Sequence, residues 1–445
     1  MILLRKLKIA IFLSLLIVSL GNVVLSNAIE FEGKIYKNIY VREIDLSNLT
    51  KEEATEKINK TLESKNCFSL IFNNEKYIFS KNDIGVDYDV NEVVEKAYSI
   101  GRDKGLVSNI KTKSSLSMGK KIMLDYSITY DERKIDKYLN EMNKKIYIKP
   151  KSATIRIVNG KIVITKEKNG YRLNEDELKN IIIEKIKNIN NEDETIPTLS
   201  VNPLYSYDDL SKINTVLGSF ETYFNTNNYN RSNNIKLAAN ATNNILLEKG
   251  EIFSFNSYIQ NSHINKYLKE APVIVNGKPK KGIGGGMCQV SSTIYNAALY
   301  SGMKIINVRN HSIPSPYIEM GRDATVSGGT IDLKFSNKFD NPVFIYNQVI
   351  GNKIVCTIYG NKKDNTNIEI ITETTETLHN RIIRKNSEEY DLGVKTIEQE
   401  GRKGYKVQTY RIYKNNLGDK TEYIGLSYYP PQDKIIVYGT KELRK

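Results

Sequence analysis

The sequence predicts a membrane-anchored, multidomain α+β protein, and three observations predict this class. Two stretches in the N-terminal half each combine helical periodicity with an alternating hairpin. A central stretch, residues 282–302, joins a glycine-rich turn to a helical pattern. The chain after about residue 366 alternates apolar and polar residues in short runs separated by glycines. Helices and strands in these separate runs are typical of α+β modules followed by an all-β module.

The first segment, residues 1–29, is predicted to be a signal anchor or a signal peptide. Three basic residues among the first eight precede an uncharged run, Ile9–Ile29, which is long enough to span a bilayer. Positive residues before such a span keep the N-terminus in the cytoplasm. The small residues Ser26 and Ala28 would also suit a cleavage site. We therefore expect a single-pass membrane protein with its domains outside the cell, or a protein secreted to the cell wall.

The net charge of +14 over 445 residues narrows the choice of partners. A basic surface suits nucleic acid, anionic lipid or the anionic polymers of a bacterial wall. Because the N-terminal segment exports the chain, we expect wall polymers and exclude nucleic acid. The three cysteines and three histidines are widely spaced, without paired metal-ligand spacing. We expect no disulfide framework, no metal and no cofactor.

Two α+β modules are predicted, in residues 30–117 and 118–204. Each has the order helix, hairpin, glycine followed by apolar residues, and helix. The second hairpin turns at Asn159 and Gly160, and Asn-Gly between alternating strands is a strong hairpin signal. Neither module contains a convincing catalytic set, so we interpret them as spacers or wall-binding elements.

The third domain is predicted in residues 205–365. A helix is expected over 233–247 and a strand over 304–309, with His311 just beyond the strand. The motif GIGGGMCQVSSTIYNAALYSG stands between them, and its apolar residues recur at helical spacing from Val290. This spacing places Cys288 in the first turn of a helix, where the positive dipole end favours a thiolate. Glycines before it let backbone N–H groups approach a carbonyl oxygen closely.

The bland alternative is that Cys288 is a small buried hydrophobic residue. The glycine spacing fits neither a phosphate loop nor a dinucleotide fingerprint. Cys67 and Cys356 lie in alternating or apolar runs, so both are predicted to be buried and dispensable. Residues 366–445 are predicted to form an all-β module with exposed aromatic residues, which binds or spaces rather than catalyses.

Four motifs in this order resemble the VanW family of exported bacterial proteins: GEIFSFN, the glycine–cysteine motif, NHSIPSPY and GRDATV. The segment before them resembles the peptidoglycan-binding domain that accompanies VanW and L,D-transpeptidase domains, and the last segment resembles the G-five domain. Residues 260–270, with His263, depart from the family's usual arginine and glycine-tyrosine pattern. This departure concerns the residues expected to line the substrate site, and not Cys288.

The resemblance implies an L,D-transpeptidase that acts on peptidoglycan stem peptides. Cys288 would attack the carbonyl before the terminal D-alanine, and an amine from a neighbouring stem would resolve the thioester by linking two diaminopimelate residues. Two alternatives stay open. One is a cysteine peptidoglycan hydrolase, and the other is a non-catalytic wall-binding or glycopeptide-resistance accessory protein.

Roles follow for the residues of this domain. His311 is expected to be the general base and then the acid for the leaving amine, and Asp323 is expected to orient its ring. A histidine that caps the proline loop and an aspartate in a local turn are the structural alternatives. The remaining substrate-binding or oxyanion candidates are Gly285, Gly286, Met287, Ser291 and Ser292.

Overall fold

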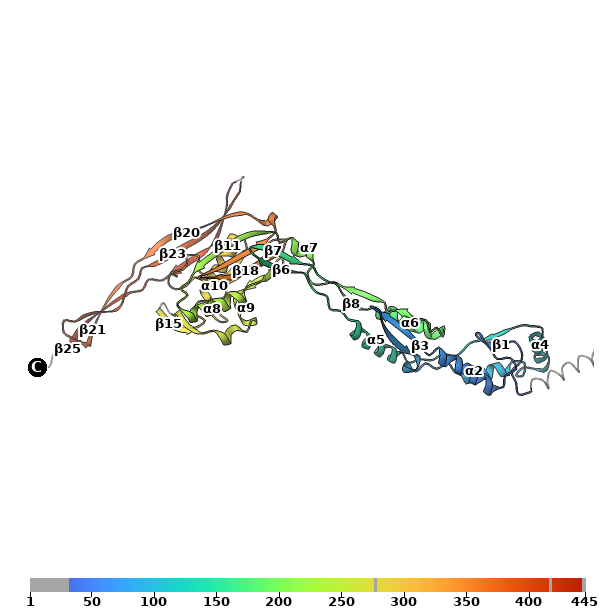
Figure 1. Cartoon of the computed structure of the whole chain (residues 1–445). Helices are drawn as coiled ribbons and strands as arrows, with labels where there is room; N and C mark the ends of the chain where they lie inside the picture. Colours follow the sequence, from blue (N-terminus) through green and yellow to red (C-terminus); the bar gives the residue numbers. More distant parts are fainter. Residues whose placement is uncertain (1–31, 276–277, 416–417, 442–445) are drawn as a thin grey trace, which may run out of the picture. The chain divides into compact units, whose positions relative to one another are not determined.

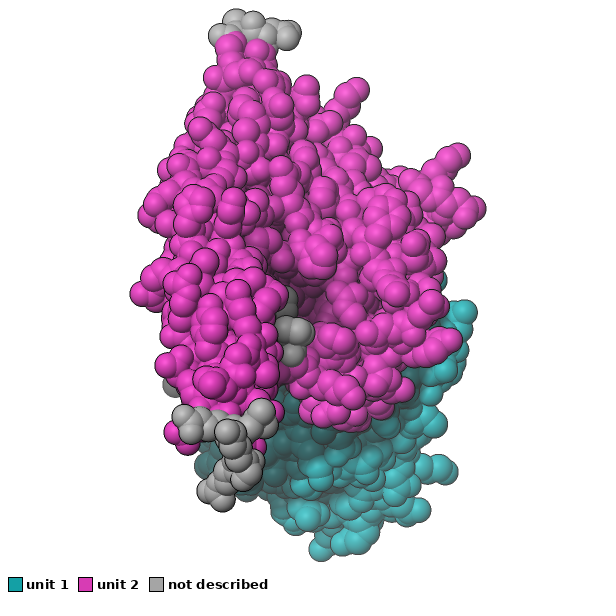
Figure 2. Space-filling model, turned by 90° about the vertical axis from the view of Figure 1, so that its left-hand side faces the viewer, with its two compact units in different colours: residues 1–151, 168–202 teal, residues 152–167, 203–445 magenta. Residues whose placement is uncertain are grey.

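The computed structural model describes residues 32–275, 278–415 and 418–441, and the chain divides into two compact units (Figures 1 and 2). Unit 1 comprises the chain up to Lys151 together with Lys168–Asn202. Unit 2 comprises Ser152–Glu167 and Pro203–Lys445. The segment predicted to be a signal or anchor, residues 1–29, lies outside the described residues. Within the described ranges, no helix is both long and apolar enough to cross a membrane.

Unit 1 is a mixed α+β unit with short sheets. Its helices are α2 (Lys51–Ser64), α3 (Val90–Ser99), α4 (Leu106–Ser117), α5 (Glu132–Ile146) and α6 (Glu175–Lys187), with the 3₁₀ turn η1 (Lys81–Ile84). Its strands are β1 (Ile39–Val41), β2 (Ile44–Asp45), β3 (Cys67–Phe72), β4 (Glu75–Ser80), β5 (Ile122–Leu124), β8 (Gly170–Leu173), β9 (Glu194–Thr195) and β10 (Thr198–Val201). Thr50 begins α2 with a capping box to Glu53, which satisfies two free N–H groups of the helix start.

The two cores of unit 1 do not follow the predicted division at residues 117 and 118. One core joins Ile39, Ile58 and Val94 to Ile189, which lies far along the chain. The other packs the β3–β4 hairpin against α5 and α6, and β3 pairs in parallel with β9. Elements of the two predicted modules are therefore interleaved, because apolar faces on short sheets need partners that their own segment does not supply.

The second hairpin also lies elsewhere than predicted. Strands β6 (Thr154–Val158) and β7 (Lys161–Thr165) turn at Asn159 and Gly160, both at positive φ, as the sequence predicted. The hairpin belongs to unit 2, where its isoleucines pack with Phe344 and Tyr359. Residues 118–204 therefore contribute to both units.

The central part of unit 2 packs helices on a four-stranded sheet with the order β11–β19–β18–β12. A second sheet has the order β13–β17–β16, and β14 pairs with β15. The strands are β11 (Thr215–Tyr223), β12 (Ile245–Leu247), β13 (Ile252–Ser254), β14 (Glu270–Val275), β15 (Lys278–Ile283), β16 (Lys304–Asn307), β17 (Lys334–Ser336), β18 (Val343–Ile350) and β19 (Lys353–Gly360). The helices are α7 (Tyr207–Ser211), α8 (Tyr229–Ala241), α9 (Phe255–Asn261) and α10 (Met287–Tyr300), with 3₁₀ turns η2 (Ile264–Tyr267) and η3 (Lys362–Asp364).

Helix α8 is shorter than predicted at its C-terminal end. It ends at Ala241, and residues 245–247 of the predicted helix form β12 instead. Asn244, which lies between the C-cap Thr242 and β12, has a φ of 56°, a left-handed conformation that asparagine tolerates well and that turns the chain into the strand. Helices α8 and α10 pack against each other, and α10 covers β11 and β19.

The C-terminal region is all β, as predicted, and it packs on the end of α10. Its strands are β20 (Asn367–Leu378), β21 (Ile382–Asp391), β22 (Lys395–Gln399), β23 (Gly404–Lys414), β24 (Lys420–Tyr429) and β25 (Lys434–Lys441). They form two sheets with the orders β20–β23–β24 and β21–β25–β22. Figure 1 labels β20 and β23 of the first sheet and β21 and β25 of the second. The fully buried Arg411 on β23 donates hydrogen bonds to the carbonyl oxygens of Leu299 and Met303.

Candidate active site

The glycine-rich turn delivers Cys288 to the start of α10, as the sequence predicted. Gly286 precedes the helix with a φ of 108°, which L residues rarely adopt. A Cβ on Gly286 would lie 2.8 Å from Ile235 on α8, and one on Gly285 would lie 2.6 Å from the carbonyl oxygen of Pro272. Both α8 and β14 therefore press on the turn, and only glycine fits there.

The Cys288 thiol is half-buried and faces the backbone of Val326. Its Sγ lies 3.4 Å from the Val326 carbonyl oxygen and 3.5 Å from the Val326 nitrogen. Cys288 is the second residue of α10, where the helix N–H groups and dipole favour an anion. This environment is consistent with a nucleophile. It does not match the alternative interpretation, in which Cys288 is a small hydrophobic residue buried in the core.

Residues 322–326 are tied to α10 by a series of hydrogen bonds. Asn296 donates to the carbonyl oxygen of Arg322 at 2.8 Å and accepts from its Nε at 2.7 Å. Ser292, one turn earlier, accepts from the Ala324 nitrogen at 2.9 Å. Helix α10 thus forms hydrogen bonds with residues 322 and 324. The side chain of Asp323, between them, forms its hydrogen bonds with His311 and Tyr429 instead. The helix that carries the thiol therefore also fixes the segment that carries the carboxylate.

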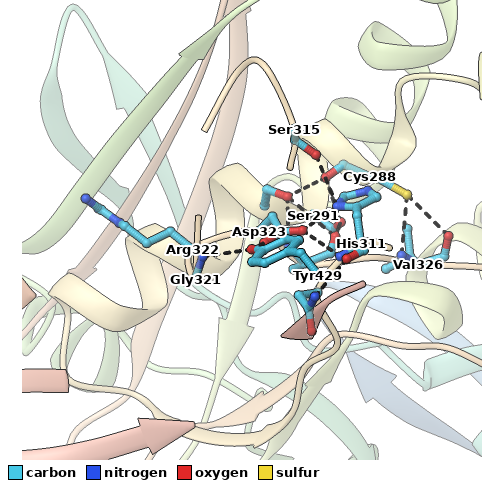
Figure 3. A network of polar contacts seen from close by, with 12 residues as sticks. Cys288, Ser291, His311, Ser315, Gly321, Arg322, Asp323, Val326 and Tyr429 are labelled. Carbon is cyan, nitrogen blue, oxygen red and sulfur yellow. Dashed lines mark hydrogen bonds and ion pairs between the residues drawn. The ribbon is translucent and has the colours of Figure 1, made fainter. Parts of the chain in front are cut away.

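Asp323 binds His311 through a single carboxylate oxygen (Figure 3). Its Oδ2 accepts from the His311 backbone N–H and lies next to the ring Nδ1, both at 2.6 Å. The Ser315 hydroxyl lies 3.2 Å from the same Nδ1. His311 and Asp323 are both buried, so this pair interacts strongly.

The electrostatic environment of His311 links it to the cysteine. Burial lowers the pKa of His311, but the hydrogen bond with Asp323 and the interaction with the neighbouring Cys288 raise it more, giving a pKa of about 9. Since Nδ1 faces Asp323, the other ring nitrogen, Nε2, is the one available to the thiol. The three residues predicted from the sequence as a catalytic set therefore lie together in the order Cys288, His311, Asp323.

The predicted oxyanion and substrate residues have three different environments. Among the described residues, no acceptor is bound by the N–H groups of Gly285, Gly286 and Cys288. The Met287 N–H instead donates to the Gly284 carbonyl oxygen at 3.1 Å, so Met287 is no longer a candidate oxyanion donor.

Ser291 and Ser292 are fully buried and donate to the Cys288 carbonyl oxygen at 3.1 and 2.7 Å. Ser291 also donates to the Ala324 carbonyl oxygen at 2.6 Å. Their hydroxyls therefore hold the helix and the neighbouring segment together, and burial keeps them from a substrate.

Three residues of the site were missed by sequence reasoning. Tyr429, in the C-terminal module, donates to Asp323 Oδ1 at 2.5 Å. Arg231 on α8 donates to Gln289 at 2.7 Å. Burial lowers the pKa of its guanidinium, while the neighbouring Tyr317 and Cys288 act in the opposite direction. Tyr317 is a further electrostatic neighbour of Cys288, and burial is the main reason that its pKa is raised. Tyr317 ends the motif NHSIPSPY but was given no role there, and no local signal marked Tyr429 or Arg231.

The other cysteines and histidines lie outside this set. Cys356 is fully buried, as predicted, and burial raises the pKa of its thiol. Cys67 is exposed, so the prediction that it is buried was wrong: it is the first residue of β3, and its side chain points to solvent. His263 and His379 are exposed. In the described part of the chain, no group of three or more His, Cys, Asp or Glu residues could hold a metal ion.

The fold and the site define a class of protein: an α+β domain with a cysteine–histidine–aspartate set, followed by an all-β module. The chain belongs to the VanW family. The model "VanW like protein" matches residues 230–359, which include all three residues of the set. YoaR of Bacillus subtilis (strain 168), described as an uncharacterized protein, is 33% identical over 242 residues, which cover 54% of this chain and 79% of YoaR.

A second relative is the vancomycin B-type resistance protein VanW of Enterococcus faecalis (strain ATCC 700802 / V583). It is 33% identical over 139 residues, which cover 30% of this chain and 50% of that protein. The chain therefore spans half the length of this relative.

Two further family models match the flanking regions. The model "Putative peptidoglycan binding domain" matches residues 77–194, and the model "G5 domain" matches residues 369–441. Among solved structures, the IgA1 protease G5 domain is 24% identical and covers 17% of this chain and 94% of that chain, with a TM-score of 0.15. The HP0197 G5 domain is 21% identical and covers 17% and 100%, with a TM-score of 0.12. The chain is thus a cell-wall-associated VanW-family protein with a peptidoglycan-binding domain and a G5 domain.

Proposed function

We propose that the protein is a cysteine L,D-transpeptidase that crosslinks peptidoglycan stem peptides outside the cell. The observation that carries this proposal is the grouping of Cys288 at the start of α10 with its electrostatic neighbour His311, whose ring Nδ1 lies 2.6 Å from Asp323 Oδ2. A nucleophile, a histidine within reach and a carboxylate that orients the histidine are the parts needed for acyl transfer.

The pKa of about 9 for His311 gives the histidine its role in the first step. At neutral pH the imidazole holds a proton. The attacking form of a cysteine is the thiolate. Sγ attacks the carbonyl carbon before the terminal D-alanine, and the S–C bond forms. The C–N bond to D-alanine breaks, and the His311 proton passes to the leaving amine.

The second step resolves the thioester with an amine from a neighbouring stem. The amine nitrogen bonds to the carbonyl carbon, the S–C bond breaks, and the proton lost by the amine returns to His311. The free N–H groups of Gly286 and Cys288 would stabilise the oxyanion in both steps. The nearby Arg231 adds a positive charge that favours the thiolate and the oxyanion.

The partners follow from the domain composition. The peptidoglycan-binding domain and the G5 domain would hold the protein on wall polymers, and the net charge of +14 favours anionic ones. Residues 1–29 would anchor the chain in the membrane through one segment, or direct its secretion.

The experiment that tests the activity is mass spectrometry of products formed from a disaccharide tetrapeptide. We expect the wild type to release D-alanine, to form a dimer linked between two diaminopimelate residues, and to exchange the terminal D-alanine for an added D-amino acid. Cys288→Ala should abolish all three reactions. Cys67→Ser should leave them unchanged, and it is a matched control because Cys67 is also accessible to solvent.

Two outcomes would contradict the proposal in different ways. Tripeptide as the sole product, even at high acceptor concentration, would assign the site to a peptidoglycan hydrolase that uses the same three residues. No product from the wild type would favour the non-catalytic wall-binding protein.

A further inference from the structure

Tyr429, the last residue of β24, lies in the site although it belongs to the C-terminal module. Its side chain is 1% exposed. Its Oη donates to Asp323 Oδ1 at 2.5 Å and accepts from the Gly321 N–H at 2.8 Å (Figure 3). Burial and the adjacent Asp323 raise the pKa of Tyr429, so its phenol keeps the proton that it donates. The contact is therefore a buried, charge-assisted hydrogen bond.

Neighbouring residues of the same module bind the chain close to Asp323 and close to His311. Thr409 on β23 donates to the Gly321 carbonyl oxygen at 2.9 Å, two residues before Asp323. The side-chain nitrogen of Asn310 donates to the Tyr428 carbonyl oxygen at 2.9 Å, one residue before His311. The module thus contacts the chain beside the carboxylate and beside the imidazole.

The two carboxylate oxygens of Asp323 have different hydrogen-bond partners. Oδ2 accepts from His311, whereas Oδ1 accepts from Tyr429. Without the phenol, Oδ1 would be a buried carboxylate oxygen with no donor among the described residues. Such a group costs free energy, and rotation of the carboxylate toward another donor would relieve this cost. That rotation would weaken the hydrogen bond that orients the His311 ring.

We propose that Tyr429 is a positioning residue for the catalytic set, so that the G5 domain completes the active site of the VanW domain. The phenol fixes the Asp323 carboxylate, the carboxylate fixes the His311 ring, and the ring stabilises the Cys288 thiolate. The reaction affected is the one proposed above, but the effect on the thiol is independent of the substrate.

The test measures alkylation of Cys288 by iodoacetamide against pH in the full chain, with modified peptides quantified by mass spectrometry. Tyr429→Phe removes only the hydroxyl. We expect alkylation at pH 7 to slow roughly tenfold and the rate–pH curve to move to higher pH, because a poorly held Asp323 stabilises the imidazolium and thiolate less. Turnover should fall up to about a hundredfold with little change in KM, as small misplacements of reacting groups do.

Tyr428→Phe is the matched control, because Tyr428 is the adjacent residue, is 48% exposed and contacts Asn310 only through its backbone. It should leave the curve and turnover unchanged. A wild-type rate–pH curve in Tyr429→Phe would overturn the proposal even if its melting temperature fell. Should that variant not fold, Thr409→Val is expected to move the curve in the same direction, and an unchanged curve would overturn the proposal. If the wild type makes no product, the proposed transpeptidase function is wrong. The rate–pH curve of alkylation still tests the role of Tyr429, because it needs no substrate.

Discussion

At the scale of single residues, the site depends on Asp323 Oδ2, which binds both the backbone and the ring of His311. Two bonds to one oxygen fix the imidazole relative to its own main chain. With Nδ1 held by the carboxylate, Nε2 is the ring nitrogen that remains for proton exchange with the thiol or the substrate. The position of the histidine is thus set by one side chain twelve residues later in the sequence.

The raised pKa of His311 predicts how stability changes with pH. The pKa of about 9 lies above the ordinary value of 6.5, so the folded state binds the proton more tightly than the unfolded state does. The protonated ring therefore stabilises the fold fully below about pH 6.5, and this contribution is lost as the pH rises through about 9. The difference in melting temperature between the wild type and His311→Gln should shrink over this range in scanning calorimetry. A difference that stays constant or grows would contradict this prediction.

The sequence predicted the residues whose roles follow from local chemistry. Glycines before a helical pattern identified Cys288, and a chain with three histidines left few candidates for His311. Tyr429 and Arg231 could not be found in this way, because only tertiary packing brings them to the site. The same limit explains Cys67: an alternating strand shows which residues share a face, but not which face is covered.

At the scale of elements, α10 is held at both ends. Its start carries Cys288, and its end is held by Arg411, which donates to the carbonyl oxygens of Leu299 and Met303 and pairs with Glu422. Donors at a helix C-terminus satisfy carbonyl groups that lack a partner within the helix. The C-terminal module therefore stabilises the helix that presents the thiol.

We predict that Arg411→Met destabilises the protein by about 2–4 kcal/mol, because it removes the Arg411 hydrogen bonds to the carbonyl oxygens of Leu299 and Met303 and the cationic partner of Glu422. Arg381→Met is the matched control in the same module. Arg381 pairs with Asp433, but its side chain is 82% exposed, so its loss should lower the melting temperature far less than the loss of Arg411. Calorimetric melting temperatures compare the two variants. Equal values for both would show that the contact with α10 contributes no stability.

Helix α10 was predicted closely, whereas α8 was not. An apolar stripe and a following glycine marked the ends of α10. The pattern after Asn233 stayed apolar beyond Ala241, so the start of β12 was not visible in it. The turn at Asn244 depends on a left-handed conformation that asparagine permits but does not require.

At the scale of the whole molecule, the β6–β7 hairpin determines where one unit ends and the other begins. Its alternation predicted the strands and the turn correctly. Ile162 on the inner face packs with the cluster of Phe344 and Tyr359, while Val163 on the outer face is 44% exposed. Alternation alone could not identify these partners, because they lie far along the chain.

We predict that Ile162→Ser lowers the melting temperature of unit 2 and leaves that of unit 1 unchanged. Burying a serine in place of isoleucine should cost about 1–3 kcal/mol. Val163→Ser, on the opposite face of the same strand, should change stability by less than about 0.5 kcal/mol. Calorimetry with separate transitions for the units measures both. A shift of the unit 1 transition instead would show that the hairpin belongs to unit 1.

The interleaving of the two units along the sequence also determines the order in which their parts are synthesised and can fold. A chain is made from its N-terminus, so β6 and β7 emerge before Lys168–Asn202, which completes unit 1. Unit 1 can therefore fold while the isoleucine face of the hairpin still awaits β18 and β19. An isolated two-stranded hairpin is only marginally stable in water. The hairpin is thus the first part of unit 2 to be made, and it can be buried only after the strands that carry Phe344 and Tyr359 have emerged.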